Sequence, residues 1–136
     1  MEHNVTIEVE QVVKREGQKE CFSYQTMGQW LKKESAWIRY QEQIESATVD
    51  VTLKVLEGSV KLIRNGDIRM NLHFVEGQET TTFYELPYGK MLLTVQTLGM
   101  NHFVSESGGR LKIHYVLFQD DEKVGTYQYE IKYKER

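Results

Sequence analysis

Apolar and polar residues alternate along almost the whole chain with a period of two. In the first segment, Val5, Ile7 and Val9 alternate with Thr6 and Glu8. Successive side chains of a β-strand point to opposite faces, so this period predicts strands with one buried face, about nine or ten of them. The apolar residues of the later segments are Phe22 and Tyr24; Ala36, Ile38 and Tyr40; Val49, Val51, Leu53 and Val55; Ile68, Met70, Leu72 and Phe74; Tyr84 and Leu86; Met91, Leu93 and Val95; Leu111, Ile113, Tyr115 and Leu117; and Tyr127, Tyr129, Ile131 and Tyr133.

The expected strands are joined by short polar connections at residues 57–58, 64–66, 76–78, 87–89 and 120–122. Short connections join antiparallel neighbours, and many antiparallel strands hide their edges by closing into a barrel. We therefore predict a single all-β domain over residues 1–136, an antiparallel up-and-down β-barrel of about eight to ten strands, the architecture of which lipocalins and streptavidin are examples. A two-sheet sandwich is the alternative, although it usually needs longer crossing connections.

Two stretches and one turn need a separate interpretation. Residues 28–34 and 99–109 fit the alternation poorly and could form a helical turn, a strand end or a loop. The Asn-Gly dipeptide at 65–66 marks a hairpin. A three-residue loop at 64–66 pairs Leu62 with Ile68, keeps the apolar residues on one face and needs Gly66 in a left-handed conformation. We predict this loop rather than a two-residue turn.

Composition limits the classes of partner. The net charge is −3, which gives no general attraction to nucleic acid or to anionic membranes. Cys21 is the single cysteine, so an internal disulfide and a cysteine zinc site are excluded. The N-terminal residues are acidic and alternating, and no apolar run is long enough to span a membrane. We expect a cytoplasmic protein and leave open whether it is a monomer or a homodimer.

Signals for catalysis are weak. The histidines at positions 3, 73, 102 and 114 lack the spacing of a local metal site, and we expect His73 and His114 on the surface. Ser59 and Ser107 lack the surroundings of a hydrolase nucleophile, and no glycine-rich phosphate loop is present. We expect no metal, no cofactor and no catalytic residue, and we favour a non-catalytic protein while leaving an enzyme open.

The tyrosines indicate a possible binding site. Several share the phase of residues that we assign to the interior, where a phenol ring supplies an apolar body and a hydroxyl. They could line a pocket for a small amphipathic or lipophilic ligand, or they could belong to a packed core. Arg39 could face this interior as an anion partner or lie outside near Trp37. The interior candidates are Trp37, Arg39, Met70, Leu72, Thr82, Tyr84, Tyr115, Tyr127 and Tyr129.

A basic row on the outer face gives the alternative function. Lys54, Lys61 and Arg69 could line up across neighbouring strands, with Arg64 at the tip of the hairpin, and contact protein or RNA. Acidic neighbours and the lack of interleaved aromatic residues disfavour nucleic acid. We interpret the row chiefly as a charged face that prevents edge pairing.

Three segments of the chain resemble the YwiB-like family of Gram-positive bacteria. They are VKLIRNGDIRMNLHF at 60–74, ELPYGKMLLTVQT at 85–97 and GGRLKIHYVL at 108–117. The resemblance implies a calycin-type, lipocalin-like β-barrel and extends over nearly the whole chain. The family is of unknown function, so the resemblance brings no catalytic or binding residues.

Overall fold

The computed structural model describes residues 2–32, 36–44, 47–66 and 69–136. These residues form strands and contain no helix that could cross a membrane. The strands are β1 (Glu2–Arg15), β2 (Gln18–Lys32), β3 (Ala36–Ile44), β4 (Ala47–Leu56), β5 (Ser59–Gly66), β6 (Arg69–Val75), β7 (Glu79–Leu86), β8 (Gly89–Val104), β9 (Gly108–Gln119) and β10 (Glu122–Glu135).

The ten strands form one closed antiparallel barrel. Each strand pairs with its neighbours in the sequence, and β1 pairs with β10 to complete the ring. The predicted up-and-down barrel is confirmed, and closure removes the free edges that a two-sheet sandwich would leave. The stretches at 28–32 and 99–104, which fit the alternation poorly, are the ends of β2 and β8, while residues 33–35 lie outside the described part.

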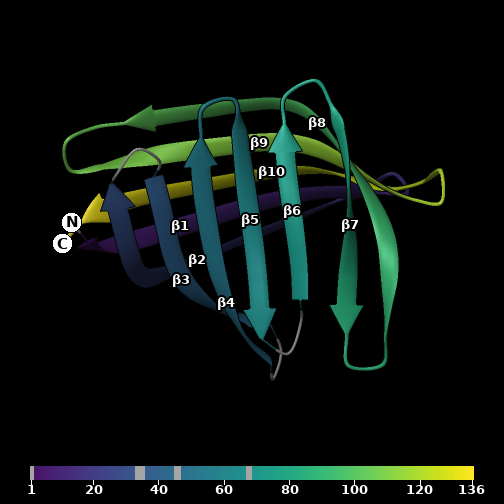
Figure 1. Cartoon of the computed structure of the whole chain (residues 1–136), viewed down its shortest axis with the longest axis horizontal. Coiled ribbons are helices and arrows are strands. Elements are labelled where there is room, and N and C mark those ends of the chain that lie inside the picture. Colours follow the sequence, from purple (N-terminus) through teal and green to yellow (C-terminus); the bar gives the residue numbers. More distant parts are fainter. Residues whose placement is uncertain (1, 33–35, 45–46, 67–68) are drawn as a thin grey trace.

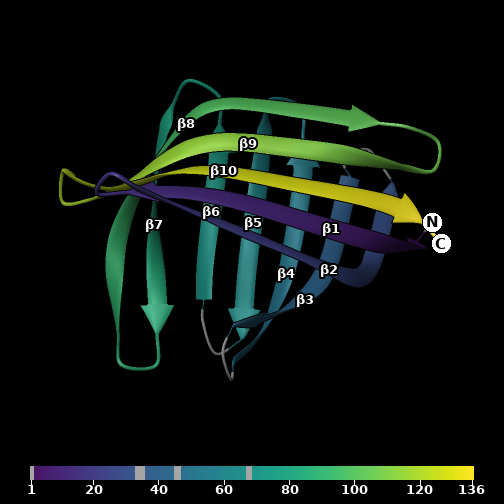
Figure 2. The same ribbon diagram turned by 180° about the vertical axis from the view of Figure 1, so that it is seen from behind.

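The barrel is flattened into two layers. Strands β3 to β7 make one layer, and they run across the long strands β8, β9, β10, β1 and β2 of the other (Figure 1). The view from behind shows the long strands in front and the two chain ends close together (Figure 2). Side chains between the layers form the core, and fully buried examples are Val5, Ile7, Ile38, Leu53, Phe74, Leu111, Ile113 and Ile131.

Gly28 lies where β2 passes from one layer to the other. Before this residue β2 pairs only with β1, and from Gly28 onward it also pairs with β3. A Cβ atom at Gly28 would overlap the carbonyl oxygen of Arg39 and lie 2.7 Å from Cδ1 of Ile7. Only glycine lets the two backbones approach this closely, so Gly28 allows the change of layer.

The predicted loop at 64–66 is wrong. Leu62 pairs with Leu72, and Arg64 still belongs to the ladder opposite Met70. The predicted partner of Leu62, Ile68, lies outside the described residues. The observed pairing differs by an even number of positions from the predicted one, so each side chain keeps its face. Gly66 has a φ of 149° but is part of β5, where its Cα faces Val49 and a Cβ would lie 2.6 Å from the carbonyl oxygen of Thr48.

Candidate functional site

The barrel wall has a weak seam between β6 and β7. Among the described residues, backbone pairing joins these strands at two positions, Arg69 with Glu85 and Met70 with Tyr84. By contrast, β7 pairs with β8 along its whole length. Nearer the turn, the hydroxyl of Thr80 donates a 2.5 Å hydrogen bond to the carbonyl oxygen of His73. Side chains and solvent can therefore reach between the two backbones.

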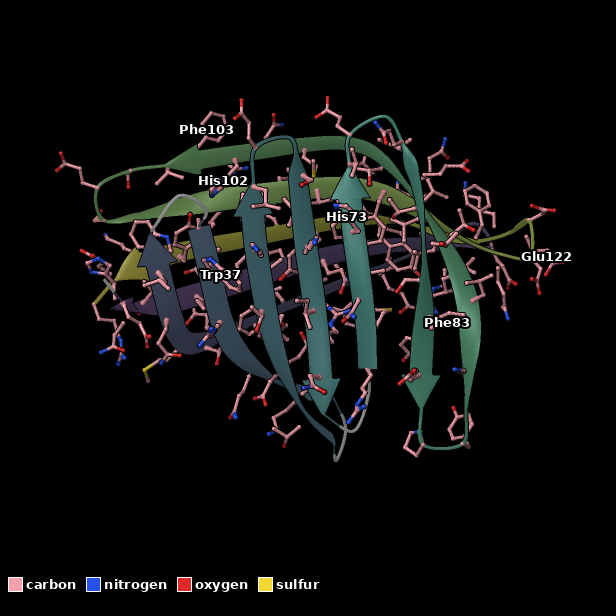
Figure 3. The ribbon with its side chains drawn as sticks, viewed as in Figure 1. Trp37, His73, Phe83, His102, Phe103 and Glu122 are labelled. Carbon is pink, nitrogen blue, oxygen red and sulfur yellow. The ribbon has the colours of Figure 1, made fainter. Side chains whose placement is uncertain are left out.

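A cleft of about 790 Å³ opens at this seam, and we call it the seam cleft. Figure 3 labels His73 on β6 and Phe83 on β7, which lie on the two sides of the seam. The lining of the seam cleft combines side chains of the outer face with side chains of the barrel interior. The lining residues are Lys61, Ile63, Arg64, Asn65, Arg69, Met70, Asn71, Leu72, His73, Thr81, Thr82, Phe83 and Glu85.

The seam cleft is amphipathic and carries positive charge. Lys61 and Arg69 are exposed at its outer side, while Met70 and Leu72 are buried at its inner side. Phe83 lines it with a side chain that is 53% exposed and adds apolar surface to the outer side. An apolar surface beside several cations is suited to a molecule that has both an apolar part and a polar part.

Arg64 reaches the interior from the inner side of the seam cleft. It follows Val60 and Leu62 on the buried face of β5, and only 12% of its side chain is exposed. Its Nε atom lies 3.8 Å from Oε1 of Glu42, whose side chain is 11% exposed. Burial alone would lower the pKa of Arg64, but the Glu42 carboxylate and the nearby tyrosines together outweigh this effect, and the pKa is raised. Arg64 therefore keeps its positive charge inside the barrel.

Tyrosine hydroxyls extend this charged pair across the interior. Tyr24 donates a 2.6 Å hydrogen bond to Oε2 of Glu42, and its oxygen lies 3.4 Å from that of Tyr40. The hydroxyls of Tyr40 and Tyr129 lie 2.6 Å apart. We call Tyr24, Tyr40, Glu42, Arg64 and Tyr129 the interior polar cluster. Burial raises the pKa of Tyr24, Tyr40 and Tyr129, so the three hydroxyls stay protonated and can donate.

Most of the predicted interior residues lie inside the barrel, and two do not. Met70, Leu72, Thr82, Tyr115, Tyr127 and Tyr129 are buried, and Tyr84 is partly buried against the core. Tyr115 and Tyr127 stack at 5.1 Å between ring centres, and a side-chain nitrogen of Arg15 donates a 3.1 Å hydrogen bond to the Tyr127 hydroxyl. These positions are consistent with either a pocket wall or a packed core.

The assignment of Trp37 to the interior is wrong, and Arg39, for which both sides were considered, lies on the outer face. Ile38 and Tyr40 occupy the buried face of β3, so Trp37 and Arg39, which alternate with them, point outward. Arg39 is exposed, and the ring of Trp37 lies beneath the ammonium group of Lys54, 4.7 Å from ring centre to Nζ. Alternation alone does not show which face of β3 carries Arg39, whereas the burial of Ile38 and Tyr40 places Arg39 on the outer face.

The predicted outer basic row is also wrong in one member. Lys54, Lys61 and Arg69 point outward, but Arg64 points inward and belongs to the interior polar cluster. The physical reason is that the Glu42 carboxylate, 3.8 Å away, compensates the positive charge of the guanidinium inside the barrel. The seam cleft nevertheless brings three of these basic residues together, because Lys61, Arg64 and Arg69 all line it.

Sequence reasoning did not select Tyr24, Tyr40 or Glu42 as site residues. The signal was present, because Glu42 follows Ile38 and Tyr40 at the same period that placed those two residues inside. Arg64 was missed because the predicted loop at 64–66 removed it from the strand whose buried face carries Val60 and Leu62.

A second cleft of about 790 Å³ opens where β2 separates from β3. Thr26, Met27, Gln29, Arg39, Tyr40, Gln41, Asp50, Val51 and Thr52 line it. The Asp50 carboxylate, one of the charged groups in this second cleft, already accepts a 3.0 Å hydrogen bond from Gln41.

Within the described ranges, no group of three or more His, Cys, Asp and Glu side chains is arranged to hold a metal ion.

Comparisons with known proteins agree with this fold. The family model "Domain of unknown function (DUF1934)" matches residues 7–131. The uncharacterized β-barrel protein YwiB of Bacillus subtilis (strain 168) is 28% identical over 131 residues, which cover 96% of this chain and 92% of that protein. The crystal structure of the ywiB protein from Bacillus subtilis superposes with a TM-score of 0.91 at 26% identity, over 99% of this chain and 93% of that one.

Proposed function

Because the chain belongs to the DUF1934 family of domains of unknown function, whose description names no activity, we propose a function from the barrel itself. We propose that it binds a small amphipathic molecule at the seam cleft, with the polar end of the ligand directed to the interior polar cluster. The apolar part would lie along Met70, Leu72 and Phe83.

The observation that carries this proposal is that Arg64 belongs both to the buried charged cluster and to the lining of the cleft in the interrupted wall. Burying Arg64 and Glu42 costs desolvation energy, and well-packed apolar residues could replace such a pair without loss of stability. Arg64 links this cluster to the seam cleft, because it also lines the cleft at the seam, where the described residues of β6 and β7 pair at two positions. A polar site behind an opening in an apolar barrel is the arrangement expected of a ligand site.

The calycin- or lipocalin-like relationship and the cytoplasmic location are further parts of the proposal. Their support is the sequence resemblance, together with the free and exposed thiol of Cys21.

The alternative, an outer face that binds protein or RNA, has less support. Its four basic residues are divided, since Arg64 points inward and Lys54 is stacked on Trp37. The remaining cations, Lys61 and Arg69, line the seam cleft. The same side chains therefore serve the small-molecule proposal better than an extended contact surface.

Native mass spectrometry of protein purified from cells without detergent tests the proposed function. We expect a bound amphipathic molecule, which is lost when Thr81→Trp fills the seam cleft from its exposed side. Thr6→Trp is the matched control, because Thr6 is exposed on β1 and lies away from the cleft. A protein that carries no such molecule and binds none from a series of decyl amphiphiles would overturn the proposal.

A further inference from the structure

Arg64 carries a buried positive charge whose hydrogen-bonding capacity is not filled. Among the described residues, its buried Nε atom has no hydrogen-bond partner. The distance of 3.8 Å to Oε1 of Glu42 allows attraction but is too long for a hydrogen bond. A buried charged donor without an acceptor is costly, so an acceptor supplied from outside would be bound strongly.

We propose that the ligand of the seam cleft carries a carboxylate, and that this carboxylate takes the place of Glu42 on Arg64. The inference rests on the proposed function above, because it specifies the polar end of that ligand. It assigns Arg64 as the anchor of the site and Glu42 as the group that occupies its neighbourhood when no ligand is bound.

Glu42 neutralises Arg64 without satisfying it. Its other oxygen, Oε2, accepts the 2.6 Å hydrogen bond from Tyr24, which holds the carboxylate to the side of the guanidinium. A guanidinium presents parallel N–H groups that match the two oxygens of a carboxylate. A ligand carboxylate that is free to orient can therefore make the paired contact that Glu42 does not make.

The surroundings favour an anion that is joined to an apolar body. Lys61 and Arg69 at the outer side of the cleft attract negative charge towards the opening and repel cations. Arg64 supplies a single positive charge inside, which matches a singly charged group. Met70 and Leu72 lie beside it and offer a surface for an apolar chain.

The exchange makes Glu42 a competitor of the ligand. Two carboxylates near one guanidinium repel each other, and the repulsion is strong where water is largely excluded. We therefore expect removal of the Glu42 charge to strengthen the binding of a carboxylate and to leave the binding of a neutral amphiphile unchanged. This prediction follows from the exchange and not from amphiphile binding in general.

Titration calorimetry with decanoate, 1-decanol and decyltrimethylammonium, each below its micelle-forming concentration, tests the inference. The three probes share an apolar chain and differ in the charge of the head group. We expect decanoate to bind about tenfold more tightly than 1-decanol, and decyltrimethylammonium to bind most weakly. Glu42→Gln should tighten decanoate binding roughly tenfold without changing 1-decanol binding.

Variants of Arg64 identify the anchor. Arg64→Met should weaken decanoate binding by about tenfold or more and leave 1-decanol binding intact. Arg64→Lys keeps the charge but loses the paired donors, so it should also weaken decanoate binding, and it replaces Arg64→Met if that variant does not fold. Lys61→Met is the control cation at the outer side, and its effect should be several-fold smaller.

The outcomes separate this inference from the proposed function. The carboxylate exchange would be overturned if decanoate and 1-decanol bound equally well. It would also be overturned if neither Glu42→Gln nor Arg64→Lys changed the affinity for decanoate. In both cases the proposal that the protein binds amphiphiles would be retained. Failure of every probe to bind would overturn the proposed function, and the exchange with it.

Discussion

The hydroxyl oxygens of Tyr40 and Tyr129 lie 2.6 Å apart inside the barrel, although 89 positions separate the two residues in the sequence. Tyr40 belongs to β3 in one layer and Tyr129 to β10 in the other, so this hydrogen bond joins the two layers directly (Figures 1 and 2). The side chains are 4% and 2% exposed, respectively, so no bulk water replaces the bond if it is lost.

Removing one of these hydroxyls should therefore destabilise the fold. We expect Tyr129→Phe to lower the free energy of unfolding by about 1–3 kcal/mol, because the Tyr40 hydroxyl loses a buried partner. Urea denaturation followed by circular dichroism measures the loss. Tyr88→Phe is the control, since Tyr88 is 87% exposed, and it should change stability by less than about 0.5 kcal/mol. Equal stability of the two variants would show that the interlayer bond contributes nothing.

The buried pair of Arg64 and Glu42 should be strongly coupled. Arg64→Met leaves the Glu42 charge without its counter-ion and should cost about 3 kcal/mol of unfolding free energy. The double variant Arg64→Met/Glu42→Gln removes both charges and should be more stable than Arg64→Met alone. A double-mutant cycle in urea measures a coupling of about 1–3 kcal/mol. Additive effects would mean that the two charges do not interact in solution.

High pH should destabilise the barrel through its buried tyrosines. Burial raises the pKa of Tyr115 from 10.0 to about 12, and it raises that of Tyr133 to about 12 as well. The unfolded chain releases these protons near pH 10, whereas the folded chain keeps them until about pH 12. The unfolded state binds fewer protons in this window, so stability present below pH 10 is lost progressively as the pH rises to about 12.

Urea denaturation at several pH values, with tyrosinate absorbance recorded in parallel, follows this loss. Tyr115→Phe should reduce the decline in unfolding free energy between pH 10 and about 12. A stability that stays constant over this window would contradict the burial of these phenols.

The change of layer at Gly28 predicts an intolerant position. Gly28→Ala forces a methyl group against the backbone of Arg39 and the side chain of Ile7, and we expect a loss of about 3 kcal/mol or more. Gly99→Ala is the matched control, because a Cβ at Gly99 meets no atom within 4 Å. Thermal unfolding compares the two variants. Similar melting temperatures would argue against the close approach of β2 and β3.

The two tryptophans should differ in their access to solvent. Trp30 is 1% exposed, whereas Trp37 lies on the outer face beneath Lys54. With Trp37→Phe, the remaining fluorescence should resist quenching by iodide, and with Trp30→Phe it should be quenched readily. Acrylamide quenching of the same variants checks that charge repulsion does not cause the difference. Protected fluorescence from Trp37 would restore the interior assignment that the structure contradicts.

Sequence alternation was sufficient for the fold because it reports which side of a strand is buried. It could not determine the pairing of β5 with β6, since any shift by an even number of residues keeps Val60 and Leu62 inside. It could not reveal the interrupted ladder at the seam, which depends on backbone distances between Asn71–Phe74 and Thr80–Phe83 rather than on residue type. Arg64 and Glu42 were misjudged for a different reason: each stabilises the other inside, and their contact joins strands that are not neighbours.

The pairing of β1 with β10 has a consequence for how the molecule is made. During synthesis β1 emerges first, but the strand that covers its second edge contains residues 122–135 and emerges last. Until then the growing chain presents an open row of backbone donors and acceptors, which other chains could join. Charged side chains along β1 would discourage such contacts between nascent chains; they are Glu2, Glu8, Glu10 and Lys14. The first strand is therefore protected against wrong pairing by its own charges until β10 has been synthesised.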